Sequence, residues 1–264
     1  MNIFLHELKA YRKSTIIWTL SLIAAMAFFL SIFPSFSKDA AEMNRLIQGY
    51  PEALRKAVGI TIDLSSILGY YSCVFLYIVL CGSIQAMNLG ISIISKEVSL
   101  KTADFLLTKP VSRSMILTSK IAAGITSLII TNIFYVPAAL LIAFYVKTGP
   151  LDIKIFIMIS ITLLFLQLIF FSLGFLISII FTKIKSVISV SLYFIFGSFI
   201  INMFESVIGE KTLRYITPFR YFDTAYIVNN GSYETAFLYI SVIIIIAAFT
   251  LSYIIYSKKD IHTV

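Results

Sequence analysis

The chain is short of charged residues, and this shortage excludes an ordinary soluble protein. Asp, Glu, Lys and Arg together make up 13% of its 264 residues, whereas soluble domains average about 25%. Hydrophobic residues make up 59%, and the mean hydropathy is +0.95. We therefore expect an integral membrane protein. Its length fits one compact membrane domain, residues 1–264, rather than several.

Cysteine and histidine are scarce as well. The two cysteines, Cys73 and Cys81, lie in one apolar stretch, and on a helix this separation is too large for a disulfide between them. The two histidines, His6 and His262, stand at opposite ends of the chain, so no group of residues has the spacing of metal ligands. The sequence therefore predicts neither a disulfide nor a metal site, and no cofactor in this chain.

Six apolar stretches are each long enough to cross a bilayer, which takes about 20 residues of helix. They cover residues 15–36, 66–95, 121–146, 155–182, 187–204 and 235–256. The sequence thus predicts an all-α integral membrane protein with six transmembrane helices.

None of these six stretches contains Asp, Glu, Lys, Arg or His. Transporters driven by protons or sodium usually need an ionisable group inside the membrane, and an intramembrane hydrolase needs a nucleophile with a base, or a metal. Both classes are therefore disfavoured. The main polar side chains of the spans are expected to form hydrogen bonds between helices. They are Gln85, Asn88, Asn132, Gln167 and Asn202.

Basic residues are unevenly divided between the two sides of the membrane. With the N-terminus inside, segments 1–14, 95–120, 183–186 and 257–264 hold 12 basic and 4 acidic residues, and the outer segments hold 9 of each. The net charge of +8 then lies entirely on the inner side, as the positive-inside rule requires. We expect both termini in the cytoplasm, and the protein in the plasma membrane of a prokaryotic cell.

The first residues, "MNIFLHELKAYRK", have the pattern of an amphipathic helix. Phe4, Leu5, Leu8 and Tyr11 can share one face, and charged residues such as Glu7 lie elsewhere. This pattern predicts an interfacial helix over residues 1–14. A frayed basic terminus is the alternative.

Two outer loops carry signals of local structure. In residues 37–65, the run Gly49-Tyr50-Pro51 separates two short helical segments. In residues 215–227, Pro218 interrupts regular structure, and aromatic residues are expected to form a belt at the outer membrane interface. These aromatic residues are Tyr215, Phe219, Tyr221, Phe222 and Tyr226.

The most polar segment of the chain is "SKEVSLKTADFLLTKPVSRSMILTSK", residues 95–120. Residues 97–108 contain no Gly or Pro, and Pro110 ends the helix because it has no N–H to donate. A cytoplasmic helix this short is not stable alone. It must dock on the helix bundle, on the lipid surface or on another protein.

The run "EVSLKTADFLLTKPVSR" resembles a pattern in the permease subunits of type-2 ABC transporters, E-x-x-x-G-T-x-E-F-L-L-x-x-P-V-S-R. Asp104 replaces the usual Glu, and Lys101 stands where the family often has Gly. The resemblance extends over the whole chain, including "YPEAL" in the first outer loop and "TPFRYFD" in the last. The matching residues are Glu97, Thr102, Phe105, Leu106, Leu107, Pro110, Val111, Ser112 and Arg113.

This resemblance implies that residues 97–109 form a coupling helix that sits in a groove of a separate cytoplasmic ABC ATPase. ATP and Mg would bind in that partner, which would move the coupling helix and switch the membrane path. The residues implied in partner binding are Glu97, Lys101, Thr102, Asp104, Phe105, Leu106, Leu107 and Arg113. The nearest string to a P-loop in this chain, "VIGEKTL", lacks the Gly-Lys pair.

The resemblance also implies a dimer with a second copy or a sibling permease, embedded in membrane lipid and without nucleic acid. The path would lie between the two permeases, with spans 66–95 and 187–204 as candidates to line it. The expected function is export of an amphipathic or hydrophobic substrate such as a peptide, lipid, drug or toxin. The alternative is a membrane scaffold that recruits a cytoplasmic partner through residues 97–113 and transports nothing. A further alternative for residues 95–120 is a cationic loop resting on anionic lipid.

Overall fold

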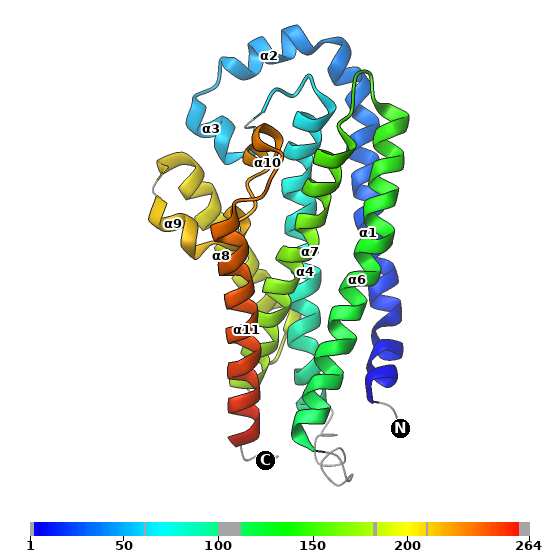
Figure 1. The fold of residues 1–264 in the computed structure, drawn as a ribbon, viewed down its shortest axis with the longest axis vertical. Helices are drawn as coiled ribbons and strands as arrows, with labels where there is room; N and C mark the ends of the chain where they lie inside the picture. The colour runs from blue at the N-terminus through cyan, green and yellow to red at the C-terminus, as the bar shows by residue number, and fades with distance from the viewer. Residues whose placement is uncertain (1–2, 61, 100–111, 182–183, 210, 259–264) are drawn as a thin grey trace.

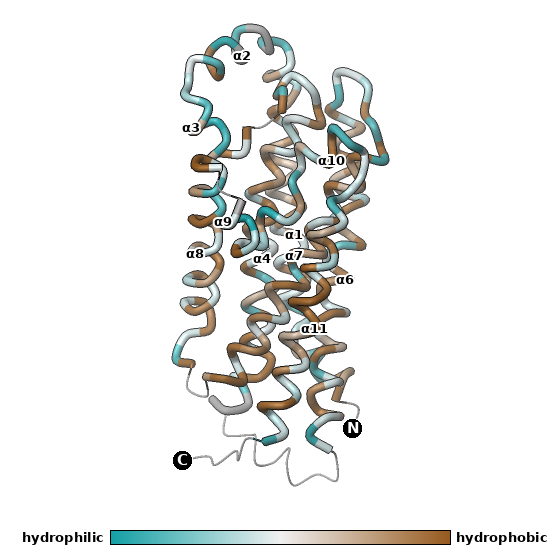
Figure 2. The backbone as a smooth tube through the Cα atoms, turned by 60° about the vertical axis from the view of Figure 1, so that its left-hand side comes forward, coloured by the Kyte–Doolittle hydropathy of each residue, from teal (hydrophilic) through white to brown (hydrophobic). Residues whose placement is uncertain are grey.

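The computed structural model describes residues 3–60, 62–99, 112–181, 184–209 and 211–258. Six of its helices are long and apolar enough to cross a membrane, which confirms the predicted fold class. They are α1 (Ile3–Lys38), α4 (Ile67–Ser99), α6 (Arg113–Val146), α7 (Ile153–Ile180), α8 (Val187–Ile208) and α11 (Thr235–Lys258). Figure 2 shows hydrophobic residues along these helices and hydrophilic residues mainly in the connections between them.

Short polar side chains fix where three of the long helices begin. Ser112 accepts a hydrogen bond from the backbone N–H of Met115 at the start of α6, and Asp152 accepts one from Ile155 at the start of α7. Ser186 caps α8 in the same way. These caps satisfy N–H groups that have no partner inside the helix. At the other end of α8, Gly209 adopts a left-handed conformation (φ 72°), which glycine accepts without steric cost.

Helices α4 and α7 form the centre of the bundle (Figure 1). On one side α1 packs along α6, and on the other α8 and α11 pack against α4 and α7. Both ends of the described chain, at Ile3 and Lys258, lie at the same end of the bundle. The opposite end carries the short helices α2 (Ala40–Gln48) and α3 (Glu52–Ala57).

Two glycines allow α4 and α7 to approach closely. A Cβ atom added to Gly90 would lie 2.4 Å from the carbonyl oxygen of Phe171, and one added to Gly174 would lie 2.7 Å from the carbonyl oxygen of Met87. Both distances are far inside van der Waals contact with a backbone atom that cannot rotate away. Small residues at helix contacts are typical of membrane bundles, where close packing replaces the hydrophobic effect.

The N-terminal segment is helical, as predicted, but it is continuous with the first span. Helix α1 runs from Ile3 to Lys38 without interruption, so the structure shows no separate helix over residues 1–14. Glu7, which the pattern placed away from the apolar face, is 2% exposed and packs inside the bundle. The placement of this segment at the membrane interface stays a prediction.

The outer loops confirm one prediction and correct another. Helices α2 and α3 flank Gly49-Tyr50-Pro51, as expected. The second loop contains α9 (Lys211–Ile216), the 3-10 helix η1 (Pro218–Arg220) and α10 (Thr224–Asn230). The predicted aromatic belt is wrong for three of its five members, because the fold packs them into the core instead of leaving them at the surface. Phe219, Tyr221 and Phe222 are 6%, 2% and 6% exposed.

The close contact between α4 and α7 yields a prediction about stability. Gly90→Ala is expected to destabilise the fold by about 1–3 kcal/mol, as overpacking does, because the new methyl group meets the Phe171 carbonyl. The measurement is thermal unfolding of the purified chain in detergent. The matched control is Gly197→Ala in α8, where nothing lies within 4 Å of the added Cβ. If both variants keep the wild-type Tm, the close approach of α4 and α7 is wrong.

Candidate functional site

Most residues predicted to bind a partner lie outside the described part of the chain. Lys101, Thr102, Asp104, Phe105, Leu106 and Leu107 fall in residues 100–111, and the position of Glu97 is described only as part of helix α4. Arg113, at the start of α6, donates long hydrogen bonds of 3.5 and 3.4 Å to the carbonyl oxygens of Tyr256 and Ser257 in the last turn of α11. The first three residues of the predicted coupling helix, 97–99, belong to α4, and the rest lies outside the described residues. The ends of α4 and α6 that flank it lie at the end of the bundle where both termini lie.

A buried ionic cluster lies beside these two helix ends. The Glu7 carboxylate contacts two ammonium groups, with Oε1 at 2.7 Å from Nζ of Lys120 and Oε2 at 2.5 Å from Nζ of Lys96. Lys120 is fully buried and also donates to the carbonyl oxygen of Ile93 at 3.0 Å. Nζ of Lys96 lies 4.5 Å from the centre of the Tyr11 ring, a cation–π distance. The cluster joins α1, α4 and α6.

Sequence reasoning missed this cluster because it treated all three charged residues as parts of polar flanking segments. One signal could have found it. If residues 3–14 are taken as a continuation of the first span, they lie in the same bundle as the ends of the neighbouring helices, and Glu7 becomes a candidate for burial between helices. A buried carboxylate then requires a basic partner.

Amide side chains link four helices in the middle of the bundle. Asn132 donates to Gln167 at 2.6 Å, and Gln167 donates to Gln85 at 3.1 Å. Gln85 in turn donates to the hydroxyl of Thr131 at 3.0 Å, which accepts a further bond from Thr19 at 3.1 Å. The prediction that these polar residues bond helix to helix is confirmed for Gln85, Asn132 and Gln167.

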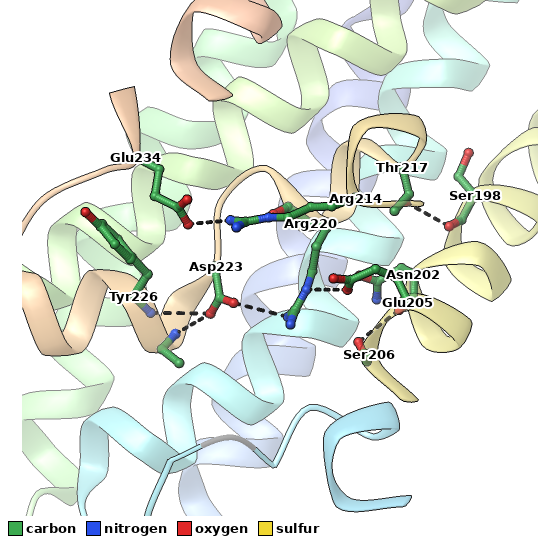
Figure 3. Close-up of polar contacts among 11 residues, drawn as sticks. Ser198, Asn202, Glu205, Ser206, Arg214, Thr217, Arg220, Asp223, Tyr226 and Glu234 are labelled. Carbon is green, nitrogen blue, oxygen red and sulfur yellow. Dashed lines mark hydrogen bonds and ion pairs between the residues drawn. The ribbon is translucent and has the colours of Figure 1, made fainter. Parts of the chain in front are cut away.

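A second ionic cluster, named the outer cluster after the predicted position of its loop, lies beside α8 (Figure 3). Glu205 is 6% exposed, and its Oε2 lies 2.6 Å from Nε of Arg220 in η1. A second nitrogen of Arg220 lies 3.3 Å from Asp223, which also accepts the N–H groups at the start of α10. Arg214 forms a further ion pair with Glu234. The last outer loop is thereby fixed to the membrane helix α8.

Glu205 was missed because α8 is longer than predicted. The apolar stretch was expected to end at residue 204, whereas the helix continues to Ile208. The carboxylate therefore belongs to the last turns of a span, where it needs the guanidinium of Arg220 as a partner. The predicted span lacks a charge only because its boundary was drawn one residue too early.

A small cavity of about 60 Å³ lies beside the outer cluster, and Arg220 and Asp223 line it. Side chains of α4, α7 and α8 form its walls, together with residues of the last outer loop such as Arg220 and Phe222. Tyr221, next to these residues, donates to the carbonyl oxygen of Tyr215 at 2.6 Å. Burial raises the pKa of the Tyr221 phenol, so the hydroxyl keeps the proton that it donates.

Helix α4 has one stripe that the rest of the chain does not fully cover. Tyr77 is 40% exposed, Cys81 is exposed, and Asn88 and Ser92 are half-buried. These positions are four, seven and four residues apart, and so share one face of the helix. Asn88 and Ser92 also line a shallow cavity of about 20 Å³ against α1. A partly polar face is costly against lipid hydrocarbon, so it favours contact with water or protein.

The described residues contain no group of three or more His, Cys, Asp or Glu side chains that could hold a metal ion. The six apolar helices define a multi-pass membrane protein. A sequence-family comparison gives the particular class. The family described as "ABC-2 family transporter protein" matches residues 1–261, so the chain belongs to this family. A search of curated proteins finds no match.

Membership of this family makes the chain the membrane permease of an ABC transporter, a transmembrane component without catalytic function of its own. The resemblance noted in the sequence is confirmed. Permeases of this family generally work with an ABC ATPase subunit, often as dimers.

The outer cluster yields a prediction about buried charge. Arg220→Gln leaves Glu205 buried without its cation. Breaking a fully buried ion pair lowers the stability of a protein by about 3–5 kcal/mol. A smaller loss of stability is expected here because Arg220 is partly exposed. The second substitution, Glu205→Gln, is expected to restore part of the loss because it removes the unpaired charge. The measurement is the Tm of single and double variants in detergent.

The control for this pair is Lys56→Gln, which breaks the exposed Lys56–Glu52 pair on α3. Exposed pairs contribute about 0–1 kcal/mol, so this variant should unfold near the wild-type temperature. A double variant less stable than Arg220→Gln alone would contradict the proposed coupling between Glu205 and Arg220.

Proposed function

We propose that this chain is the permease subunit of an ATP-driven exporter, and that a separate cytoplasmic ABC ATPase supplies its energy. The observation that carries the proposal is the family match over residues 1–261. The substrate class is an amphipathic or hydrophobic molecule, such as a peptide, lipid, drug or toxin. The protein resides in the plasma membrane of a prokaryotic cell with both termini in the cytoplasm, as the distribution of basic residues supports.

The ATPase contact is assigned to the coupling helix, residues 97–109, and to Arg113. This segment is the longest inner connection of the chain, and it holds large apolar residues beside charged ones. Apolar side chains supply burial in an interface, and charges at the rim supply orientation. The ends of α4 and α6 that carry the segment lie with both termini at one end of the bundle (Figure 1), which is consistent with a cytoplasmic position.

The substrate path is assigned to the polar stripe of α4, in a dimer of this chain with a second copy or a sibling permease. The stripe combines Tyr77, Cys81, Asn88 and Ser92, and the chain leaves this face partly open. An amphipathic substrate requires such a mixture of hydrogen-bonding and apolar groups. A second permease facing the stripe would separate it from lipid.

The first test replaces an apolar residue of the coupling helix. Leu106→Asp is expected to weaken binding of the ATPase by roughly tenfold or more, because burial of one such side chain contributes about 1.5–3 kcal/mol and 1.4 kcal/mol is a factor of ten. The membrane bundle should still fold. The measurement is co-purification of the ATPase with the tagged chain, and the control is Lys109→Ala. Normal ATPase binding by well-expressed Leu106→Asp would refute the assignment and favour the cationic-loop interpretation.

The second test separates a transporter from a scaffold. Cys81 lies on the proposed path, and a maleimide reacts with the thiolate, which forms only where water reaches the sulfur. In a Cys73→Ala background, the labelling rate of Cys81 in the assembled complex is expected to change when ATP and vanadate close the ATPases. A scaffold that transports nothing would label at the same rate with and without nucleotide.

A further inference from the structure

The Glu7 cluster joins the two helix ends between which the predicted coupling helix lies. Lys96 stands near the end of α4, just before residue 97, and Lys120 lies in the second turn of α6, after residue 112. One carboxylate on α1 contacts both, at 2.5 and 2.7 Å. The two ends of this connection are therefore held together by a residue of a third helix.

The burial of the cluster indicates more than ordinary helix packing. Glu7 is 2% exposed and Lys120 is fully buried, and removing such charges from water is costly. Apolar residues of similar volume could fill the same space without that cost. Ion pairs differ from apolar contacts in being directional, since they fix the relative position of particular atoms. This directionality matters where a movement must pass from one helix to another.

The cluster has a second neighbour at the same end of the bundle. Arg113, the first residue of α6, donates to the last carbonyl groups of α11. A displacement of the connection between α4 and α6 would therefore pull on α1 through Glu7 and on α11 through Arg113. Helices α1 and α11 pack along α6 and α7 respectively, so both sides of the bundle are linked to one short segment.

We propose that Glu7 is a positioning residue that transmits movement of the coupling helix to α1 and the membrane bundle. Its carboxylate holds the ends of α4 and α6 together as one unit through Lys96 and Lys120, so the three helices move together when the ATPase moves residues 97–109. This inference rests on the proposed function, because it requires an ATPase that docks on that segment.

The test measures coupling without requiring a known substrate. The complex of the chain with its co-purified ATPase is labelled at Cys81 in a Cys73→Ala background, with and without ATP and vanadate. Glu7→Gln keeps the shape of the side chain and removes its charge. It is expected to reduce the nucleotide-dependent change in labelling rate by about fivefold, within the range that coupling substitutions produce. The amount of bound ATPase should stay unchanged.

Three controls separate coupling from stability. Gly90→Ala destabilises the bundle without touching the cluster, so it shows what a loss of stability alone does to the labelling change. Glu42→Gln makes the same chemical substitution at an exposed site on α2. Glu7→Asp keeps the charge on a shorter side chain and is expected to restore part of the labelling change.

Each outcome decides the proposal. If the nucleotide-dependent change in Cys81 labelling is the same in Glu7→Gln as in the wild type, the proposal is overturned. It is also overturned if Glu7→Gln and Gly90→Ala lower Tm equally and Glu7→Gln reduces the labelling change no more than Gly90→Ala does. If Glu7→Gln does not assemble with the ATPase, Glu7→Asp is measured in its place. A reduced labelling change in Glu7→Asp supports the proposal. A labelling change equal to the wild type, or a failure of Glu7→Asp to assemble, overturns it. A wild-type complex without any nucleotide-dependent change refutes the proposed path and transport function. If the wild-type complex shows the nucleotide-dependent labelling change and the Glu7 variants show the same change, only the role of Glu7 is refuted.

Discussion

Each buried carboxylate in the described part of the chain contacts a basic side chain, and this pairing determines how both ends of the bundle are built. Glu7 pairs with Lys120 and Lys96 at one end, and Glu205 pairs with Arg220 at the other. A carboxylate inside a membrane bundle has no water to stabilise it, so a partner must come from another part of the chain. The pairs therefore join segments that are far apart in sequence: α1 to α4 and α6, and α8 to the last outer loop.

Between these ends the bundle is held by contacts that carry no charge. Glycines bring the backbones of α4 and α7 together, and the amides of Gln85, Asn132 and Gln167 bond across the centre. Such contacts can stabilise a fold, but they contain no source of energy for transport. Permeases of this family generally work with an ABC ATPase subunit, and in the proposed function that subunit supplies the energy. In the proposed function, the Glu7 cluster is the place where movement of the ATPase would meet the membrane helices.

Features that depend on local sequence could be predicted, and features that depend on distant contacts could not. The six spans follow from runs of apolar residues, and the break between α2 and α3 follows from Gly49 and Pro51, because each signal lies within a few residues of the structure that it causes. The burial of Phe219 and Phe222 depends on how the outer loop folds back onto α7 and α8. Phe219 contacts Phe170 and Phe199, and Phe222 contacts Phe165, with ring centres 5.1 to 5.6 Å apart. No pattern in residues 215–227 alone specifies these partners.

The composition of the two clusters also bears on the proposed orientation. The Glu7 cluster contains one carboxylate and two lysines and carries a formal charge of +1, whereas Arg220 with Glu205 and Asp223 carries −1. The cluster at the end that carries both termini is therefore net positive, and the cluster in the last outer loop is net negative. Because basic groups are retained on the cytoplasmic side during insertion, the clusters fit the orientation given by the segment charges, in which Glu7, Lys96 and Lys120 are already counted. This orientation places the end with both termini, and the connection between α4 and α6, where a cytoplasmic ATPase could reach them.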